Sequence, residues 1–126
     1  MGTWGSGNFD SDTAADHLAD VMARLITEVD EAMAGDPVRI EPDEYWGVAV
    51  PCNLEILHLL AQQDHVGTEL PKAAVVAEWK TAFMAVWERT IDGLGPSPAY
   101  KDERRAVLTA TFDRLAETCA AREADA

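Results

Sequence analysis

The chain has 126 residues, a length that predicts one domain able to bury its own core without disulfides or a structural metal. Its 23 acidic and 10 basic residues give a formal net charge of −13. This charge argues against nucleic acid and against membranes as partners, because nucleic acids and anionic lipid surfaces would repel the chain. It is compatible with a basic protein partner and also with a surface that is simply well solvated.

The first two predicted elements are long helices. Apolar residues recur at steps of three and four over residues 13–34, and Asp12 or Thr13 can cap a helix there. The second helix is expected over residues 42–63. Apolar residues surround most of its circumference, which predicts a central and largely buried helix with a kink or break at Pro51.

The third and fourth predicted elements complete a bundle. Residues 71–92 carry the heaviest apolar stripe and are expected to form the main wall of the core. Ser97 and Pro98 open the last helix as its cap and first residue, and residues 120–126 are expected to fray. Strand signals are poor. The sequence therefore predicts an all-α fold, with four main helices in a single domain over residues 1–126.

The N-terminal segment, residues 1–12, is rich in glycine and contains two aromatic residues, Trp4 and Phe9. A freely fraying terminus has no use for large aromatic side chains. Glycines allow close approach of the backbone while the aromatic side chains bury. We therefore expect this segment to pack across the bundle as a plug.

The opening residues, Met-Gly-Thr-Trp-Gly-Ser-Gly-Asn-Phe-Asp-Ser-Asp-Thr-Ala-Ala-Asp, resemble a family of small bacterial proteins named domain of unknown function 4259. The likeness is specific over residues 1–16 and looser over the remainder of the chain. The resemblance implies a bacterial, intracellular protein. It supplies no catalytic residues.

Candidate partner-binding residues are three acids and two tryptophans. Asp12, Asp16 and Asp20 repeat every four residues, so they share one face of the first helix and repel one another. Such a row is an interface for a basic partner or a solvated helix face. Trp4 and Trp46 either close the core or, if they are exposed side by side, form a binding hot spot.

Metal candidates are weak, and we expect neither a metal nor a cofactor. A calcium-loop pattern that includes Asp10 fails, because Thr13 stands at the glycine position and Ala19 at the glutamate position. Glu55 and His58 form one Glu-x-x-His pair on a predicted helix. Di-iron bundles need that pair twice, so a polar pair on a buried helix is the simpler interpretation.

The two cysteines, Cys52 and Cys119, lie in apolar helical patterns and are expected to be buried free thiols in a reducing, cytoplasmic compartment. No catalytic set is apparent. The sequence favours a small, acidic, non-enzymatic protein-binding module, of which an immunity or antitoxin-like protein is one form. The alternative is a small-ligand or metal-binding protein, with a site around Trp4, Asp10, Asp16 and His58.

Overall fold

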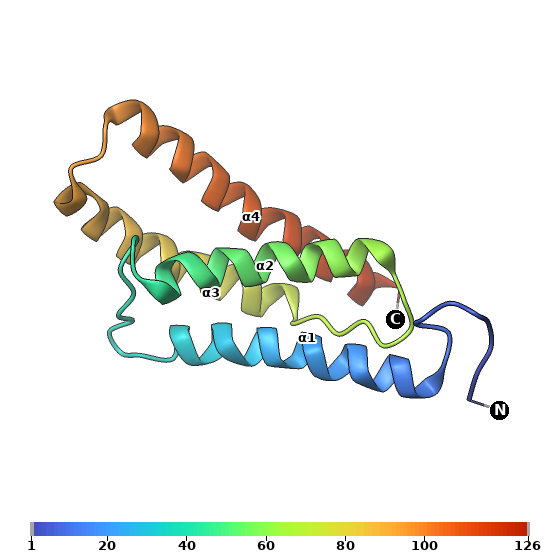
Figure 1. Ribbon diagram of the computed structural model, residues 1–126. Helices are drawn as coiled ribbons and strands as arrows, with labels where there is room; N and C mark the ends of the chain where they lie inside the picture. The colour runs from blue at the N-terminus through green and yellow to red at the C-terminus, as the bar shows by residue number, and fades with distance from the viewer. Residues whose placement is uncertain (1, 126) are drawn as a thin grey trace.

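Four long α-helices make up most of the computed structural model, which describes residues 2–125 (Figure 1). Met1 and Ala126, the outer ends of the expected N-terminal segment and C-terminal tail, lie outside the described residues. The helices pack against one another as a bundle, and the all-α prediction is confirmed. Their bounds, with a short 3₁₀ helix after the third, are α1 Asp12–Met33, α2 Tyr45–Gln63, α3 Ala73–Thr90, η1 Ile91–Leu94 and α4 Pro98–Ala124.

The helix starts show which polar side chains act as caps. Ser11, not Asp12 or Thr13, caps α1, because its Oγ accepts a hydrogen bond from the Ala14 N–H at 3.1 Å. Ser97 caps α4 as expected, with Pro98 as the first helical residue. Helix α4 continues to Ala124. The fraying of the final residues stays a prediction.

Helix α2 begins later than predicted and passes through its proline as one helix. A turn closed by the Glu44 N–H and the Glu41 carbonyl oxygen, 3.1 Å apart, precedes it. Pro51 lies in the second turn, so only the Gly47 carbonyl loses its helical donor there. Gly47 also lets the preceding turn pack against α2, because a Cβ at this position would overlap the Glu41 carbonyl oxygen.

The core lies between the four helices, and α3 supplies its largest side chains. Trp79, Phe83 and Trp87 are buried along one face of α3, as the apolar stripe predicted. Phe83 meets Phe112 of α4 with ring centroids 5.4 Å apart. The rest of the buried core comes from all four helices and includes Leu18, Met22, Val29, Val50, Leu54, Leu57, Leu108, Leu115 and Cys119.

One buried polar residue joins α2 to α1. The Asn53 amide Nδ2 donates to the Leu25 carbonyl oxygen at 3.2 Å and to Glu28 Oε1 at 2.8 Å. Both contacts lie at the same level of the bundle, so they set how the two helices are aligned along their length. A second polar link joins α1 to α3, where Trp79 Nε1 donates to Asp30 Oδ1 at 3.2 Å.

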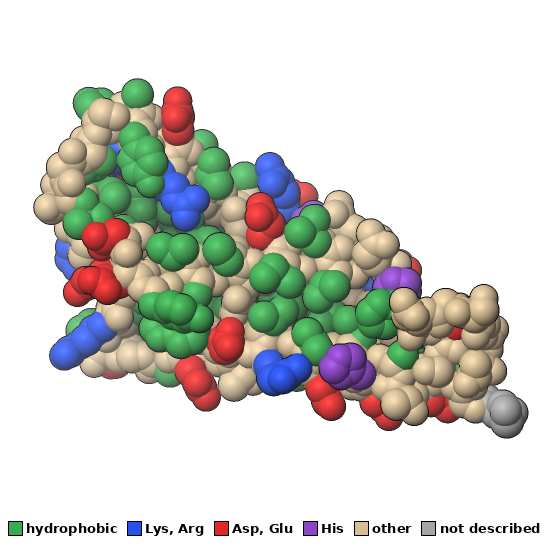
Figure 2. Space-filling view, in the orientation of Figure 1, with side chains coloured by type: hydrophobic (Ala, Val, Ile, Leu, Met, Phe, Trp, Pro, Cys, Tyr) green, Lys and Arg blue, Asp and Glu red, His purple; other side chains and the backbone are tan. Residues whose placement is uncertain are grey.

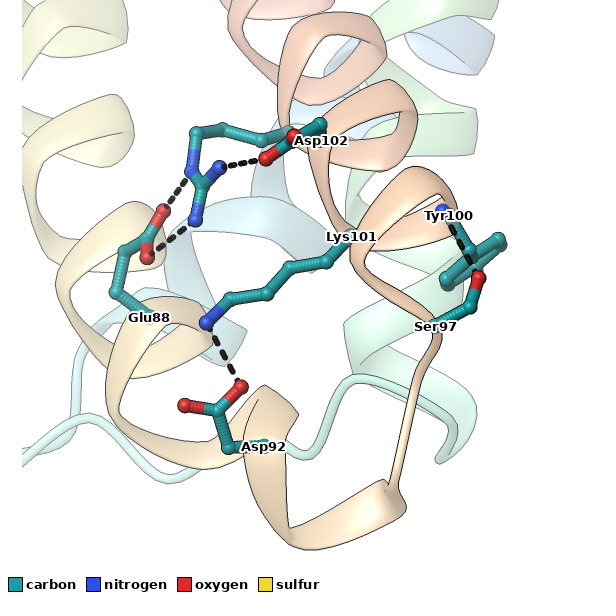
Figure 3. A network of polar contacts seen from close by, with 7 residues as sticks. Glu88, Asp92, Ser97, Tyr100, Lys101 and Asp102 are labelled. Carbon is teal, nitrogen blue, oxygen red and sulfur yellow. Dashed lines mark hydrogen bonds and ion pairs between the residues drawn. The ribbon is translucent and has the colours of Figure 1, made fainter.

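Exposed ion pairs link α3 and η1 to the first turns of α4 (Figure 3). Arg105 holds Glu88 through two hydrogen bonds, the Nη2–Oε2 pair measuring 3.0 Å. Lys101 Nζ lies 2.7 Å from Asp92 Oδ1. The Arg105 hydrogen bond lowers the pKa of the Glu88 carboxyl below its ordinary value. These pairs are partly solvated, so they contribute only modestly to the stability of the packing between α3 and α4.

The N-terminal segment, residues 2–11, folds back on itself beside the start of α1 (Figure 1). The Trp4 N–H donates to the Asp10 carbonyl oxygen at 3.0 Å. Phe9 packs against the core and stacks on His65, with ring centroids 4.6 Å apart. Trp4 keeps 49% of its surface exposed. Phe9 therefore anchors this segment to the bundle, while the Trp4 indole, expected to bury, does not.

Candidate functional site

Three acids in the first half of α1 are exposed and free of ion pairs within residues 2–125. Asp12, Asp16 and Asp20, here called the α1 acids, follow one another along the helix over about 12 Å at the usual rise per residue. Arg24 continues the row and is exposed too. The predicted row is thus present as a solvated stripe of negative charge.

Trp4 lies at the same end of the molecule as the first of these acids. The Asp12 N–H donates to the Gly2 carbonyl oxygen, and Thr3 pairs with Ser11, so the loop keeps Trp4 close to the beginning of α1. Half of the Trp4 surface is accessible. One end of the bundle therefore carries both the accessible Trp4 indole and Asp12, the first of the α1 acids.

Trp46 is at the other end. It is 40% exposed and meets Tyr45 edge-on, with ring centroids 4.9 Å apart. Helix α2 begins at the end where α1 finishes, far from the N-terminal segment (Figure 1). The two tryptophans are both accessible, but the fold does not bring them together into one hot spot.

The weak metal candidates occupy separate surroundings. Asp10 accepts a hydrogen bond from a backbone N–H of its own loop, at 2.9 Å. Glu55 is exposed on α2, and His58 Nδ1 lies 3.3 Å from Thr118 Oγ1 of α4. Within residues 2–125, one set of three acidic, His or Cys side chains has its potential ligand atoms within 4.8 Å of one another, and all three are exposed: Glu41, Asp43 and Glu44.

A surface hollow beside α1 does not gather the residues of the alternative ligand site. It is an open depression along α1, and it shares only Asp20 with the candidate residues. Its other lining includes His17, Arg24 and Glu28, which mixes both signs of charge. Trp4, Asp10 and His58 do not line it.

One exposed apolar surface, which the sequence did not predict, lies on α2. Five exposed positions along one face of this helix, here called the α2 strip, carry uncharged side chains, with the exposed Glu55 beside them, and Figure 2 shows hydrophobic side chains gathered over the helix. The largest exposed fractions are 73% for Tyr45 and 54% for Leu59. The members of the α2 strip are Tyr45, Val48, Cys52, Ile56 and Leu59.

The expectation of a largely buried second helix is therefore wrong for one of its faces. Helix α2 packs on α1 and α4, which cover two of its sides and leave the third open. The buried set, which includes Val50, Leu54 and Leu57, follows its own steps of three and four. The α2 sequence contains two sets of apolar residues, each with its own steps of three and four. This double pattern could have indicated that one apolar face packs in the core and a second one points outward.

The two cysteine thiols differ in their exposure to solvent. Cys119 is buried in the core as expected, and burial raises the pKa of its thiol to about 11. Cys52 was expected to be buried but is exposed at the middle of the α2 strip. Neither cysteine forms a disulfide.

None of the helices in residues 2–125 has both the length and the apolar character that a membrane span requires. Comparisons of the chain with protein-family models, with curated proteins and with solved structures gave no match.

Proposed function

We propose that this chain is a cytoplasmic bacterial protein-binding module without catalytic activity, which engages a basic protein partner through the α1 acids. The observation that carries the proposal is the row of three exposed carboxylates with no cation paired to them in the described part of the chain. Repulsion within the row costs a few tenths of a kcal/mol per pair. A complementary basic surface on a partner would relieve that repulsion. The positions of the charges would also fix how the partner is oriented on α1.

Two further features support this proposal. Trp4 offers a large, accessible indole at the same end as Asp12, and tryptophan is enriched among residues that dominate binding energy. The chain's charge of −13 would accelerate encounter with a basic protein at low salt. An immunity or antitoxin protein is one form that such a module takes. The free cysteines favour a reducing compartment, and the N-terminal motif favours a bacterial origin.

The test compares two variants with the same net charge. One replaces the α1 acids with asparagine. The matched control replaces three exposed acids on other helices, Glu78→Gln, Glu103→Gln and Glu117→Gln. Each variant changes the formal net charge from −13 to −10, since three negative charges are removed. General electrostatic attraction is therefore equal in the two variants, and only the position of the lost charge differs.

The wild-type protein, immobilised at low salt, should capture a basic protein from bacterial lysate, and the purified partner should then be titrated against all three proteins. We expect the control to bind like the wild type, the α1 variant to bind at least tenfold more weakly, and affinity to fall steeply as salt is added. Equal losses in the two variants, or affinity that is insensitive to salt, would contradict the proposal.

A further inference from the structure

We propose that two copies of this chain associate through the α2 strip, with their α2 helices antiparallel and the two-fold axis next to Cys52. This surface differs from the α1 acids, so the inference is independent of the proposed function. The occupant of the strip is a second copy of the chain.

The spacing of the α2 strip is the first argument. From Tyr45 to Leu59, its members lie seven and four residues before Cys52 and four and seven residues after it. The pattern is therefore the same in both directions along the helix. A two-fold symmetric interface requires one patch that is complementary to itself, and an antiparallel helix pair places each such position opposite its counterpart. Cys52, a small side chain, would then face its own copy.

The area of apolar surface is the second argument. At about 200 Å² for a large side chain, the exposed fractions of the four large members of the strip, Tyr45, Val48, Ile56 and Leu59, leave on the order of 400 Å² uncovered. A stable interface buries about 800 Å² on each partner, of which roughly 60% is apolar. The strip thus supplies most of the apolar area that one side of such an interface needs.

The distribution of charge is the third argument, and it selects the antiparallel orientation. The five strip positions carry no charge, the exposed Glu55 lies beside them, and the acidic cluster of Glu41, Asp43 and Glu44 lies just before them. In a parallel pair each cluster would face its own copy and repel it. In the antiparallel pair centred on Cys52, each cluster faces the end of the other α2 helix, where Gln62 and Gln63 offer neutral amide donors and the charge of Asp64 is paired with Arg122.

This geometry makes Cys52 a reporter of the interface. Helices pack with axes about 8–10 Å apart, and Cα atoms lie about 2.3 Å from each axis, so facing Cα atoms come within roughly 3.4–5.4 Å, a range that overlaps the Cα separation found in disulfides. That separation suits a disulfide. Cys119 is buried in the core and will not compete.

The first experiment measures the mass of the protein by sedimentation equilibrium, from micromolar to millimolar concentration. The second measures disulfide cross-linking by diamide, an oxidant that takes up the two electrons and two protons released when two thiols form a disulfide. The wild type should reach twice its 13.7 kDa mass. Diamide should then give a covalent dimer that Cys52→Ser abolishes and that Cys119→Ser leaves unchanged. Because each copy carries the same net charge, added salt should strengthen the association, opposite to its effect on a basic partner.

Two leucine variants distinguish association through the α2 strip from non-specific hydrophobic association. Leu59→Glu should raise the dissociation constant of the dimer at least tenfold, so that the variant is mainly monomeric. Leu94→Glu is the matched control, because Leu94 is 49% exposed, against 54% for Leu59, and lies in η1 away from the strip. The control should dimerise like the wild type. A protein that is monomeric at every concentration and salt level, a dimer that persists in Leu59→Glu, or a dimer without the Cys52 cross-link would each overturn the proposal.

Discussion

Single residues fix the close contacts of this bundle, and Gly67 shows how. It has a φ of +99°, and its α carbon lies against Ala15 of α1 so closely that a Cβ would overlap the Ala15 carbonyl oxygen. The segment between α2 and α3 can pass over α1 only because this position has no side chain. Gly93 provides the contrast, since a Cβ there would meet no atom within 4 Å.

We therefore expect Gly67→Ala to lower the free energy of unfolding by about 2–4 kcal/mol, from backbone strain and overlap together. Gly93→Ala should change it by no more than about 0.5–1 kcal/mol. Urea unfolding of both variants at one temperature measures the difference. Equal effects of the two substitutions would contradict the close approach of residue 67 to α1.

Cys119 gives a prediction about pH. Burial raises the pKa of its thiol from 9.0 to about 11, so the folded protein holds this proton more tightly than the unfolded chain does. The associated stability is fully present below pH 9 and is lost as pH rises toward 11. Over that window we expect the wild type to lose up to about 1.4 kcal/mol per pH unit more than Cys119→Ala. Urea midpoints measured at several alkaline pH values test this, and parallel curves for the two proteins would refute it.

Pairs of helices are held in alignment by apolar faces and by a few polar contacts between them. Asn53 is the polar contact between α1 and α2, and it is 7% exposed. Its amide group supplies two donors to two oxygen acceptors, the Leu25 carbonyl and the Glu28 carboxylate. Only a donor satisfies this position, because both partners accept.

Replacing Asn53 tests that requirement. Asn53→Ala should cost about 1–3 kcal/mol, because two acceptors lose their donor. Asn53→Asp should cost more, about 3 kcal/mol or above at neutral pH, because a carboxylate would face two oxygen acceptors in a buried place. The cost of the aspartate should shrink in mild acid, where the protonated form can donate. Thermal and urea unfolding at two pH values provide the measurement, and an aspartate variant no worse than the alanine variant would count against this account.

The whole molecule carries far more negative than positive charge, and its ion pairs in residues 2–125 lie mainly between α3, η1 and α4 and at the end of α2. The face of α1 that bears Asp12, Asp16 and Asp20 has none of them. Self-repulsion of this kind opposes the compact state and is screened by dissolved salt.

Raising the salt concentration from about 0.01 M to 1 M, which shortens the screening length from about 30 Å to 3 Å, should therefore raise the melting temperature. A gain of about 1 kcal/mol corresponds to roughly 3–6 °C for a chain of this size. The measurement belongs on Leu59→Glu, where the proposed dimer cannot contribute. Sodium and potassium chloride should act alike. An unchanged or lower melting temperature would show that self-repulsion is not significant.

The sequence determined the helices well because their signals are local. Periodicity placed four helices within a few residues of their observed bounds, and Ser97 with Pro98 marked the start of α4. The solvated row of α1 acids also follows from spacing alone, since residues four apart share a helix face. Its role in binding stays a prediction, as does the resemblance to domain of unknown function 4259.

The tertiary structure decided what each apolar surface does. Leu54 and Leu59 are the same residue type on one helix, yet one is fully buried and the other is half exposed. Periodicity reports that a face is apolar, but the neighbouring helices determine whether it is covered, and α1 and α4 leave the α2 strip open. The same long-range packing determines that Cys52 and Trp4 are exposed and that the two tryptophans lie at opposite ends of the bundle. No local spacing in the sequence encodes it.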